Sequence, residues 1–192
     1  MRVMEDSIET YAAAKEEHQY DLLDTKGLST GLCVVESEII SFLKDNGFDF
    51  GVTFPSSKLK NLLEMIEDDD EIFTVPVTRE EEGVGVCAGA YLAGKKPFML
   101  IQSSGLGNSF NAIASLLKTY RIPVLIFAEH RGSYNEKIPA QVPLGVALPG
   151  MLGAMDIPFI MINARLDSLE EFSASSFRDG EPHVALLSPE LF

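Results

Sequence analysis

The sequence predicts an α/β protein built as three layers, in which a mostly parallel sheet is flanked by helices on both faces. From about residue 31 onward, short apolar runs alternate with segments of helical periodicity, which is the pattern of repeated βαβ units. One run, residues 124–128, is apolar at every position, as expected for a strand that is covered on both faces. Glycines fall mainly at the ends of the apolar runs, where turns require them.

Each expected element has its own local support. Residues 33–43 carry an apolar helical stripe, and Gly47 ends that helix. Residues 59–66 place leucine and isoleucine at the i, i+3, i+4 and i+7 positions of a helix, with Ser56 or Ser57 as its N-cap. The expected strands cover residues 48–54, 72–77, 98–102, 124–128, 158–162 and 184–187. The later helices begin near Thr78 and cover residues 109–119, 145–155 and 169–177.

Length and charge restrict the kind of protein. At 192 residues the chain is expected to form one domain, residues 31–192, preceded by an acidic N-terminal extension, residues 1–30. A formal net charge of −14 disfavours nucleic acid and anionic membranes as partners. Because no apolar run approaches the length of a membrane span, the protein is expected in the cytoplasm, with Cys33 and Cys87 as buried free thiols.

Several loops with unusual chemistry are expected at the edge of the sheet where the strands end, which is where ligands bind in open parallel sheets. These loops comprise residues 55–58, 77–82, 103–108 and 129–141. The last of them carries His130, Arg131 and Gln141, which either contact an anionic substrate or are simply solvated. The three histidines of the chain lie far apart and lack paired ligands, so no metal site is expected.

The segment from Thr78 to Gly89 has two explanations. Thr78 and Glu81 have the spacing of a capping box, and acidic residues in a first turn stabilise the helix dipole. However, glycine costs about 1 kcal/mol relative to alanine inside a helix, and this helix carries Gly83, Gly85 and Gly89. Such a helix indicates close approach of the sheet, of a partner chain, or of a cofactor ring beside one of the carboxylates.

Two other loops also keep alternatives open. Residues 103–108 superficially resemble a phosphate loop, but they do not match GxxxxGK[ST] and lack the third glycine of GxGxxG. An ordinary strand-to-helix turn explains them equally well, and a nucleotide-binding Rossmann protein is a weak alternative. Residues 55–57 are explained either as a helix cap or as part of a ligand pocket.

Three segments together resemble the pyrimidine-binding (PYR) domain of thiamine-diphosphate enzymes. They are Thr-Arg-Glu-Glu-Glu-Gly (78–83), Ala-Gly-Ala-Tyr-Leu-Ala-Gly-Lys-Lys-Pro (88–97) and Gln-Ser-Ser-Gly-Leu-Gly-Asn-Ser (102–109). Within that family the chain is most similar to the alpha subunits of sulfopyruvate decarboxylases, and phosphonopyruvate decarboxylases are similar too. The resemblance covers residues 33–156, with Gly89-Ala90-Tyr91 where many relatives have Asp-Gly-Tyr.

The resemblance implies roles for particular residues. Counting ten residues back from Tyr91, Glu81 is the carboxylate that binds the pyrimidine N1′ of thiamine diphosphate, and an apolar pocket is expected to raise its pKa. The resemblance implies no cofactor role for Glu80 and Glu82, which are explained as acidic residues that stabilise the helix dipole. The cofactor-binding set would be Glu81, Pro55, Ser104, Gly105, Leu106, Gly107 and Asn108. The weaker substrate set would be Ser56, Ser57, His130, Arg131 and Gln141.

The same resemblance implies that half of the site is missing. The family binds the diphosphate through Mg²⁺ on a Gly-Asp-Gly motif followed by asparagine, and Asp179-Gly180 lies too near the C-terminus to serve. A beta subunit would therefore hold the diphosphate and Mg²⁺ in an alpha–beta hetero-oligomer. The implied reaction is decarboxylation of 3-sulfopyruvate to sulfoacetaldehyde in coenzyme M biosynthesis. Alternatives are a subunit acting on phosphonopyruvate or another acidic 2-oxo acid, and a non-catalytic accessory subunit.

Overall fold

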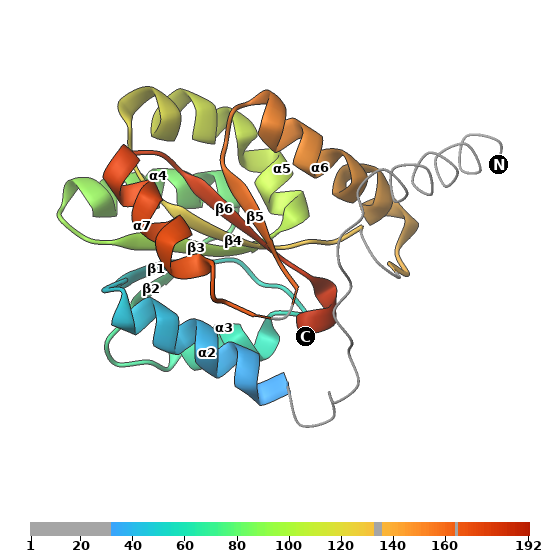
Figure 1. Cartoon of the computed structure of the whole chain (residues 1–192), viewed down its shortest axis with the longest axis horizontal. Coiled ribbons are helices and arrows are strands. Elements are labelled where there is room, and N and C mark those ends of the chain that lie inside the picture. Colours follow the sequence, from blue (N-terminus) through green and yellow to red (C-terminus); the bar gives the residue numbers. More distant parts are fainter. Residues whose placement is uncertain (1–31, 133–135, 164) are drawn as a thin grey trace. The chain divides into compact units, whose positions relative to one another are not determined.

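A parallel sheet forms the centre of the protein. The computed structural model describes residues 32–132, 136–163 and 165–192. The sheet has six strands in the order β2-β1-β3-β4-β6-β5, and every neighbouring pair is parallel (Figure 1). The strands are β1 (Phe50–Thr53), β2 (Phe73–Pro76), β3 (Pro97–Gln102), β4 (Leu125–Glu129), β5 (Phe159–Ile162) and β6 (His183–Leu187).

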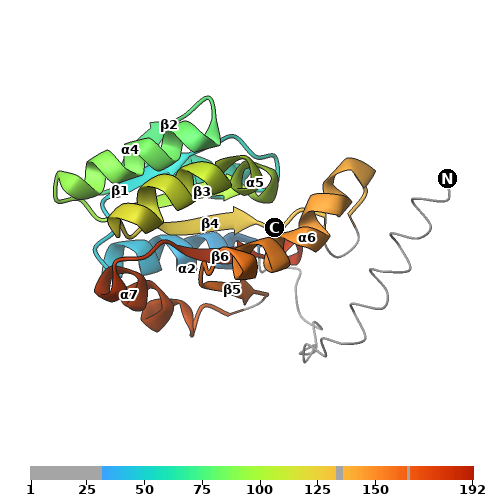
Figure 2. The same cartoon turned by 90° about the horizontal axis from the view of Figure 1, so that it is seen from above.

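Helices cover both faces of this sheet, which confirms the predicted three-layer α/β fold (Figures 1 and 2). One face carries α4 (Glu80–Leu92), α5 (Ser103–Ala112), its continuation η1 (Ile113–Lys118) and α6 (Val142–Ala154). The other face carries α2 (Leu32–Asp45), α3 (Lys60–Glu67) and α7 (Leu169–Asp179). Two short 3-10 turns, η2 (Pro139–Gln141) and η3 (Pro189–Leu191), complete the described elements.

Strand β4 shows why residues 125–128 are all apolar. Ile126 and Ala128 pack into the cluster beneath α4, α5 and α6, whereas Leu125 and Phe127 pack into the cluster beneath α2, α3 and α7. Successive side chains of a strand point to opposite faces, so a strand covered on both sides needs apolar residues throughout. The two clusters together form the core, and they hold the carboxyl ends of the strands in one row.

The connections turn to opposite faces of the sheet at this carboxyl edge. The chain leaves β1 towards α3 on one face of the sheet, but leaves β3 towards α5 on the other face. Because β1 and β3 are neighbours, the loops that follow these two strands run to opposite faces of the sheet. This place is a topological switch point, where ligands of open α/β sheets bind. The loops predicted to carry chemistry start at this edge.

Two local predictions were wrong. Residues 103–108 are the first turns of α5, not a turn before a helix, because Gly105 and Gly107 face the side chains of Glu80 and Leu144 and packing compensates for their poor helix propensity. Neither Ser56 nor Ser57 caps α3, whose N-cap is Leu59 and has no side-chain cap hydrogen bond. Helix α6 also begins earlier than predicted, at Val142, with a proline in its first turn.

Other predictions have simpler outcomes. Cys87 is a buried free thiol, as expected, and burial raises its pKa. Among the described residues, no helix is long and apolar enough to cross a membrane. The predicted N-terminal extension, residues 1–30, and the side chain of Cys33 lie outside the described part of the chain.

Candidate functional site

Glu81 lies in the first turn of α4 at the carboxyl edge of the sheet. Its side chain is 30% exposed and forms an ion pair with Arg79, the extended residue that precedes the helix. A hydrogen bond from its own backbone amide, and then the Arg79 guanidinium, hold the pKa of Glu81 below its usual value. The expectation of a raised pKa is therefore wrong for this chain, since an arginine, not an apolar pocket, lies beside the carboxylate.

The capping-box explanation of Glu81 is not what the structure shows. The hydroxyl of Thr78 donates to the carboxylate of Glu82 at 3.0 Å, and the N-cap of α4 makes no side-chain cap hydrogen bond. Glu81 is therefore not used to close the end of its own helix. Its carboxylate has solvent on one side and a single arginine on the other, which leaves room for a ligand to accept or donate a proton.

Glu80 is the glutamate that packs into the protein. It is only 6% exposed, and its carboxylate lies against Gly105 in the first turn of α5. A Cβ added at Gly105 would come within 2.3–2.5 Å of the side-chain atoms of Glu80. The positive end of the α5 dipole favours a carboxylate in this place. The signal in the sequence was the buried stripe of Glu80, Val84 and Cys87 at helical spacing, which was overlooked because its first member is charged.

The glycines of α4 fall into two groups. A Cβ at Gly83 would lie 2.7 Å from the Val52 side chain, so Gly83 lets the helix approach β1. At Gly85 and Gly89 the same Cβ would meet nothing within 4 Å. Packing against the sheet therefore explains Gly83, but no contact within the described chain explains Gly85 or Gly89.

A buried carboxylate, Glu129, ends strand β4. Its side chain is 0% exposed, and the hydroxyl of Ser56 donates to it at 2.6 Å. Since Ser56 follows β1, this hydrogen bond reaches past the end of β3, which lies between β1 and β4. Burial raises the pKa of Glu129, while Ser56 and the nearby Arg131 oppose that shift. Sequence reasoning missed Glu129, although an acidic residue directly after an apolar strand was a usable signal.

Arg131 joins the neighbouring loops to each other. Its guanidinium donates to both carboxylate oxygens of Glu136, at 2.8 and 3.0 Å, and lies 3.5 Å from Glu129. Its backbone amide donates to the hydroxyl of Ser103 at 3.0 Å. Arg131 holds the pKa of Glu136 at about 2. Because the Arg131 side chain is 12% exposed and already paired, its contact with a substrate stays a prediction.

His130 and Gln141 belong to a tightly packed loop. His130 is buried, and its Nε2 lies 2.9 Å from the carbonyl oxygen of Gly145. Burial lowers the pKa of His130, and the Gly145 carbonyl opposes that shift. A Cβ on Gly132, which has φ +77°, would lie 2.0 Å from the Gln141 carbonyl oxygen. Gly132 and Gly145 thus allow the loop after β4 to pack closely against the start of α6.

The other predicted residues lie at the same edge. Pro55, Ser56 and Ser57 line a cavity of about 390 Å³, together with the end of β2 at Pro76. On α5, Leu106 is buried and Ser104 and Gly107 are half-buried, whereas Asn108 is exposed. The structure therefore places the predicted set on neighbouring elements, with Gly105 against Glu80 and Ser56 against Glu129. It gives no direct contact between Glu81 and the cavity.

Two features of the described residues concern the binding of a metal or of phosphate: the His, Cys, Asp and Glu side chains, and the Asp-Gly pair. No group of three or more His, Cys, Asp or Glu side chains in the described ranges is placed to bind a metal ion. Asp179-Gly180 ends helix α7, with Gly180 in the left-handed conformation of a C-cap. It precedes β6, so it lies at the amino end of the sheet, opposite the edge that carries Glu81.

Comparison with known proteins agrees with this geometry. Residues 34–156 match the family described as the thiamine pyrophosphate enzyme N-terminal TPP-binding domain. Over 120 residues the chain is 53% identical to the sulfopyruvate decarboxylase subunit alpha of Methanocaldococcus jannaschii, covering 62% of this chain and 71% of that protein. Over 159 residues it is 44% identical to the sulfopyruvate decarboxylase of Methanosarcina acetivorans, covering 82% of this chain but 41% of that protein.

More distant relatives follow the same pattern. A phosphonopyruvate decarboxylase of Streptomyces viridochromogenes is 31% identical over 134 residues, which cover 69% of this chain and 34% of that protein. Among solved structures, the 2-oxoglutarate:ferredoxin oxidoreductase of Magnetococcus marinus superposes with a TM-score of 0.61 at 17% identity. That match covers 81% of this chain and 29% of the oxidoreductase, and it supports the fold alone.

Proposed function

The chain belongs to the family of thiamine pyrophosphate enzyme N-terminal domains, and we propose that it is the alpha subunit of a 3-sulfopyruvate decarboxylase. The proposal rests on 53% identity to a sulfopyruvate decarboxylase alpha subunit, compared with 31% to a phosphonopyruvate decarboxylase. One observation of the structure carries it further. Glu81 presents a partly exposed carboxylate at the ligand edge of the sheet, whereas Glu80 is buried and Glu82 accepts a hydrogen bond from Thr78.

The residues around Glu81 fit the pyrimidine half of thiamine diphosphate. The cofactor, when bound, supplies the carbanion chemistry that lets a 2-oxo acid lose carbon dioxide. Glu81 would accept a hydrogen bond from the pyrimidine N1′ and share a proton with it. Arg79 keeps the carboxylate charged until the ligand arrives, because its ion pair lowers the pKa of Glu81. Covering the site would remove solvent from Glu81 and favour proton sharing.

The other residues of the site position its loops. Glu80 packs the first turn of α4 against α5 and so helps to fix the position of Glu81 in the same turn. Glu129 and Arg131 connect the loops that follow β1, β3 and β4 through Ser56 and Ser103. Pro55, Ser56 and Ser57 line the adjacent cavity, where a small 2-oxo acid would be held.

A second subunit would supply the rest of the site. Since Asp179-Gly180 is a helix cap, the diphosphate and Mg²⁺ would be held by a beta subunit in an alpha–beta assembly. The relatives named subunit alpha support such a partner. Experiment should separate two alternatives: a subunit that decarboxylates phosphonopyruvate, and an accessory subunit that takes no part in catalysis.

The test is decarboxylation of 3-sulfopyruvate with thiamine diphosphate and Mg²⁺, assayed for the chain alone, for the partner alone and for the mixture. We expect activity only in the mixture, and higher kcat/KM for 3-sulfopyruvate than for phosphonopyruvate. Glu81→Gln removes the proton acceptor at constant shape and should lower kcat by at least about a hundredfold, the lower range for general acid–base catalysis, with cofactor binding partly retained.

Glu82→Gln is the matched control, because Glu82 is the exposed neighbour that only accepts from Thr78. It should leave kcat within about twofold, since an exposed pair of this kind is worth little. Near-normal turnover of the Glu81→Gln variant would refute the role of Glu81. Full activity of the partner without this chain would make the chain an accessory subunit.

A further inference from the structure

The carboxyl edge of the sheet carries several cationic side chains, each in a loop after a strand or in the first turn of the next helix. Over the described residues these are Lys58, Lys60, Arg79, Arg131, Lys137 and Arg165. A 2-oxo acid with an acidic tail brings two negative charges to this edge. The cations that are not already paired with carboxylates are therefore the ones that this chain can offer to such a ligand.

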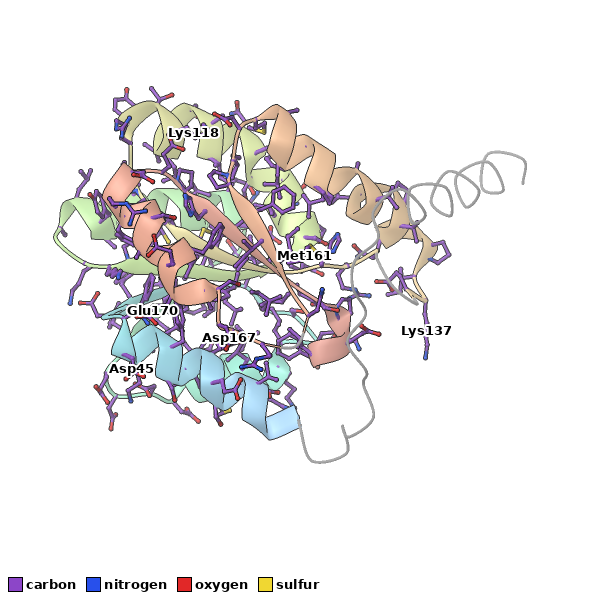
Figure 3. The ribbon with its side chains drawn as sticks, viewed as in Figure 1. Asp45, Lys118, Lys137, Met161, Asp167 and Glu170 are labelled. Atoms are coloured by element: carbon purple, nitrogen blue, oxygen red, sulfur yellow. The ribbon has the colours of Figure 1, made fainter. Side chains whose placement is uncertain are left out.

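Four of the six cations have carboxylate partners. Those ion pairs are Lys60–Glu64, Arg79–Glu81, Arg131–Glu129, Arg131–Glu136 and Arg165–Asp167. Lys58 and Lys137 form no ion pair with any residue that the structure describes. Figure 3 shows Lys137 at the tip of the loop after β4, pointing away from the protein. Lys58 is thus the cation at this edge that is both unpaired and close to the sheet.

The backbone around Lys58 is anchored on both sides. Ser56, two residues earlier, donates to Glu129 at 2.6 Å, and Leu59, the next residue, is 0% exposed. The Lys58 side chain itself is exposed, and its ammonium lies 3.5 Å from a main-chain oxygen of Phe192, at the outer limit of a hydrogen bond. Its charge helps to lower the pKa of Glu129, against the effect of burial, so the ammonium lies near the end of β4. Lys58 also follows Ser57, which lines the cavity of about 390 Å³.

The charges at the start of α3 run against the helix dipole. The positive end of a helix dipole favours acidic residues in the first turn, and both α4 and α7 carry them there. Helix α3 has no acidic residue in its first turn, and Lys58 and Lys60 stand on either side of its N-cap, Leu59. Two cations at this end disfavour the helix unless an anion lies beside them. The charge pattern therefore agrees with an anionic ligand next to Lys58.

We propose that Lys58 binds the anionic tail of the substrate, the sulfonate of 3-sulfopyruvate, and so determines which 2-oxo acids the site accepts. This inference rests on the proposed function. The carboxylate of the substrate leaves as carbon dioxide, whereas the tail keeps its charge throughout the reaction. An ion pair with the tail stabilises the bound substrate and the transition state equally, so it lowers KM and leaves kcat unchanged. Lys58 is in this sense a specificity residue and not a catalytic one.

The experiment measures steady-state kinetics of the full-length chain assembled with its partner, thiamine diphosphate and Mg²⁺. The substrates are 3-sulfopyruvate and phosphonopyruvate, whose tails are both anionic. Lys58→Met removes the charge and keeps the aliphatic stem, while Lys58→Arg keeps the charge. Lys137→Met is the matched control, because it removes an exposed, unpaired lysine from the same edge of the sheet.

We expect Lys58→Met to raise the KM for 3-sulfopyruvate by about tenfold to a hundredfold, the range for a hydrogen bond to a charged group, with kcat within about threefold of the wild type. Lys58→Arg should keep KM within about threefold, and Lys137→Met within about twofold. Added salt should raise the KM of the wild type more than that of Lys58→Met, since it screens the ion pair. Because Lys58 is exposed, the urea midpoints of all variants should agree.

Three results would overturn the role of Lys58. One is an unchanged KM in Lys58→Met, and another is a raised KM in Lys60→Met without one in Lys58→Met. The third is an equal loss in Lys58→Arg and Lys58→Met, because a packing role would then explain both.

The role of Lys58 and the proposed substrate can fail separately. An enzyme that converts phosphonopyruvate but not 3-sulfopyruvate, with a KM that depends on Lys58, would refute the substrate and support Lys58. An enzyme that converts 3-sulfopyruvate with a KM independent of Lys58 would do the reverse. If the complex converts neither acid, equilibrium dialysis of 3-sulfopyruvate decides: binding at least tenfold tighter to the wild type than to Lys58→Met supports Lys58, and equal or absent binding overturns it.

Discussion

Gly145→Ala should detach the loop after β4 from helix α6. A Cβ at this position would lie 2.1 Å from the Arg131 carbonyl oxygen and 2.6 Å from the Gly132 Cα, and both are backbone atoms that cannot rotate away. Overpacking of this kind costs about 1–3 kcal/mol. Moving the loop would also break the contact between His130 Nε2 and the Gly145 carbonyl, and leaving a buried polar group unsatisfied costs about 1–3 kcal/mol.

The better helix propensity of alanine offsets about 1 kcal/mol of these two costs, so the free energy of unfolding should fall by about 1–5 kcal/mol. A domain of this size loses about 2–4 °C in Tm for each kcal/mol. Urea unfolding of the full chain, followed by circular dichroism, would report the loss as a lower midpoint with an unchanged m-value.

Gly150→Ala is the matched control in the same helix. Its Cβ would meet nothing within 4 Å, so this variant should equal or exceed the wild type by up to about 1 kcal/mol. The reasoning is refuted if Gly145→Ala unfolds at the same urea concentration as Gly150→Ala, because the glycine-to-glycine contact would then be absent or freely adjustable.

Three further predictions concern the buried charges at the ligand edge. Glu136→Gln should lower the free energy of unfolding at pH 7 by up to about 3 kcal/mol, and by less where solvent screens the ion pair with Arg131. The pKa of Glu136 is about 2 in the folded state and ordinarily 4.5, so the stability difference between variant and wild type should narrow between pH 7 and pH 3 in urea titrations. Burial raises the pKa of Glu129, so the stability that Glu129 contributes is full below its ordinary pKa of 4.5 and is lost as pH rises through the folded-state pKa. The Glu129→Gln variant should therefore gain stability relative to the wild type as pH rises above 4.5, measured by urea unfolding. Gly105→Ala should destabilise the wild type more than it destabilises the Glu80→Ala variant, with a coupling of about 0.5–3 kcal/mol in a double-mutant cycle, because Glu80→Ala removes the atoms that the new methyl group would meet.

The sheet was predictable because the local sequence of each strand reflects whether its faces are buried. Residues 125–128 of strand β4 are all apolar because helices cover both faces of the strand, and this run alone indicates a parallel sheet within helices. The sequence misled where packing overrides propensity. Residues 103–108 are rich in glycine and serine and were predicted as a turn, yet Gly105 and Gly107 are helical because larger side chains would collide with Glu80 and Leu144.

The site was predictable only in part, for a related reason. Glu81 is predicted from the family resemblance by its count from Tyr91, which is a local measure. The hydrogen bond between Ser56 and Glu129 joins residues 73 apart, and no spacing rule connects them. Arg131 and Glu136 lie only five residues apart, but in a loop, where five residues predict no particular geometry. Arg131, which the resemblance offers to a substrate, is therefore paired within the chain.

The net charge of −14 does not oppose an anionic substrate as strongly as the sequence suggests, because the charges are unevenly placed. At the ligand edge three of the acidic groups have cationic partners: Arg79 pairs with Glu81, and Arg131 lies beside both Glu129 and Glu136. Part of the excess negative charge lies away from this edge, since helices α2, α3 and α7 expose seven acidic and two basic side chains. The proposed second subunit would therefore need to add only a few cations to make the shared site positive.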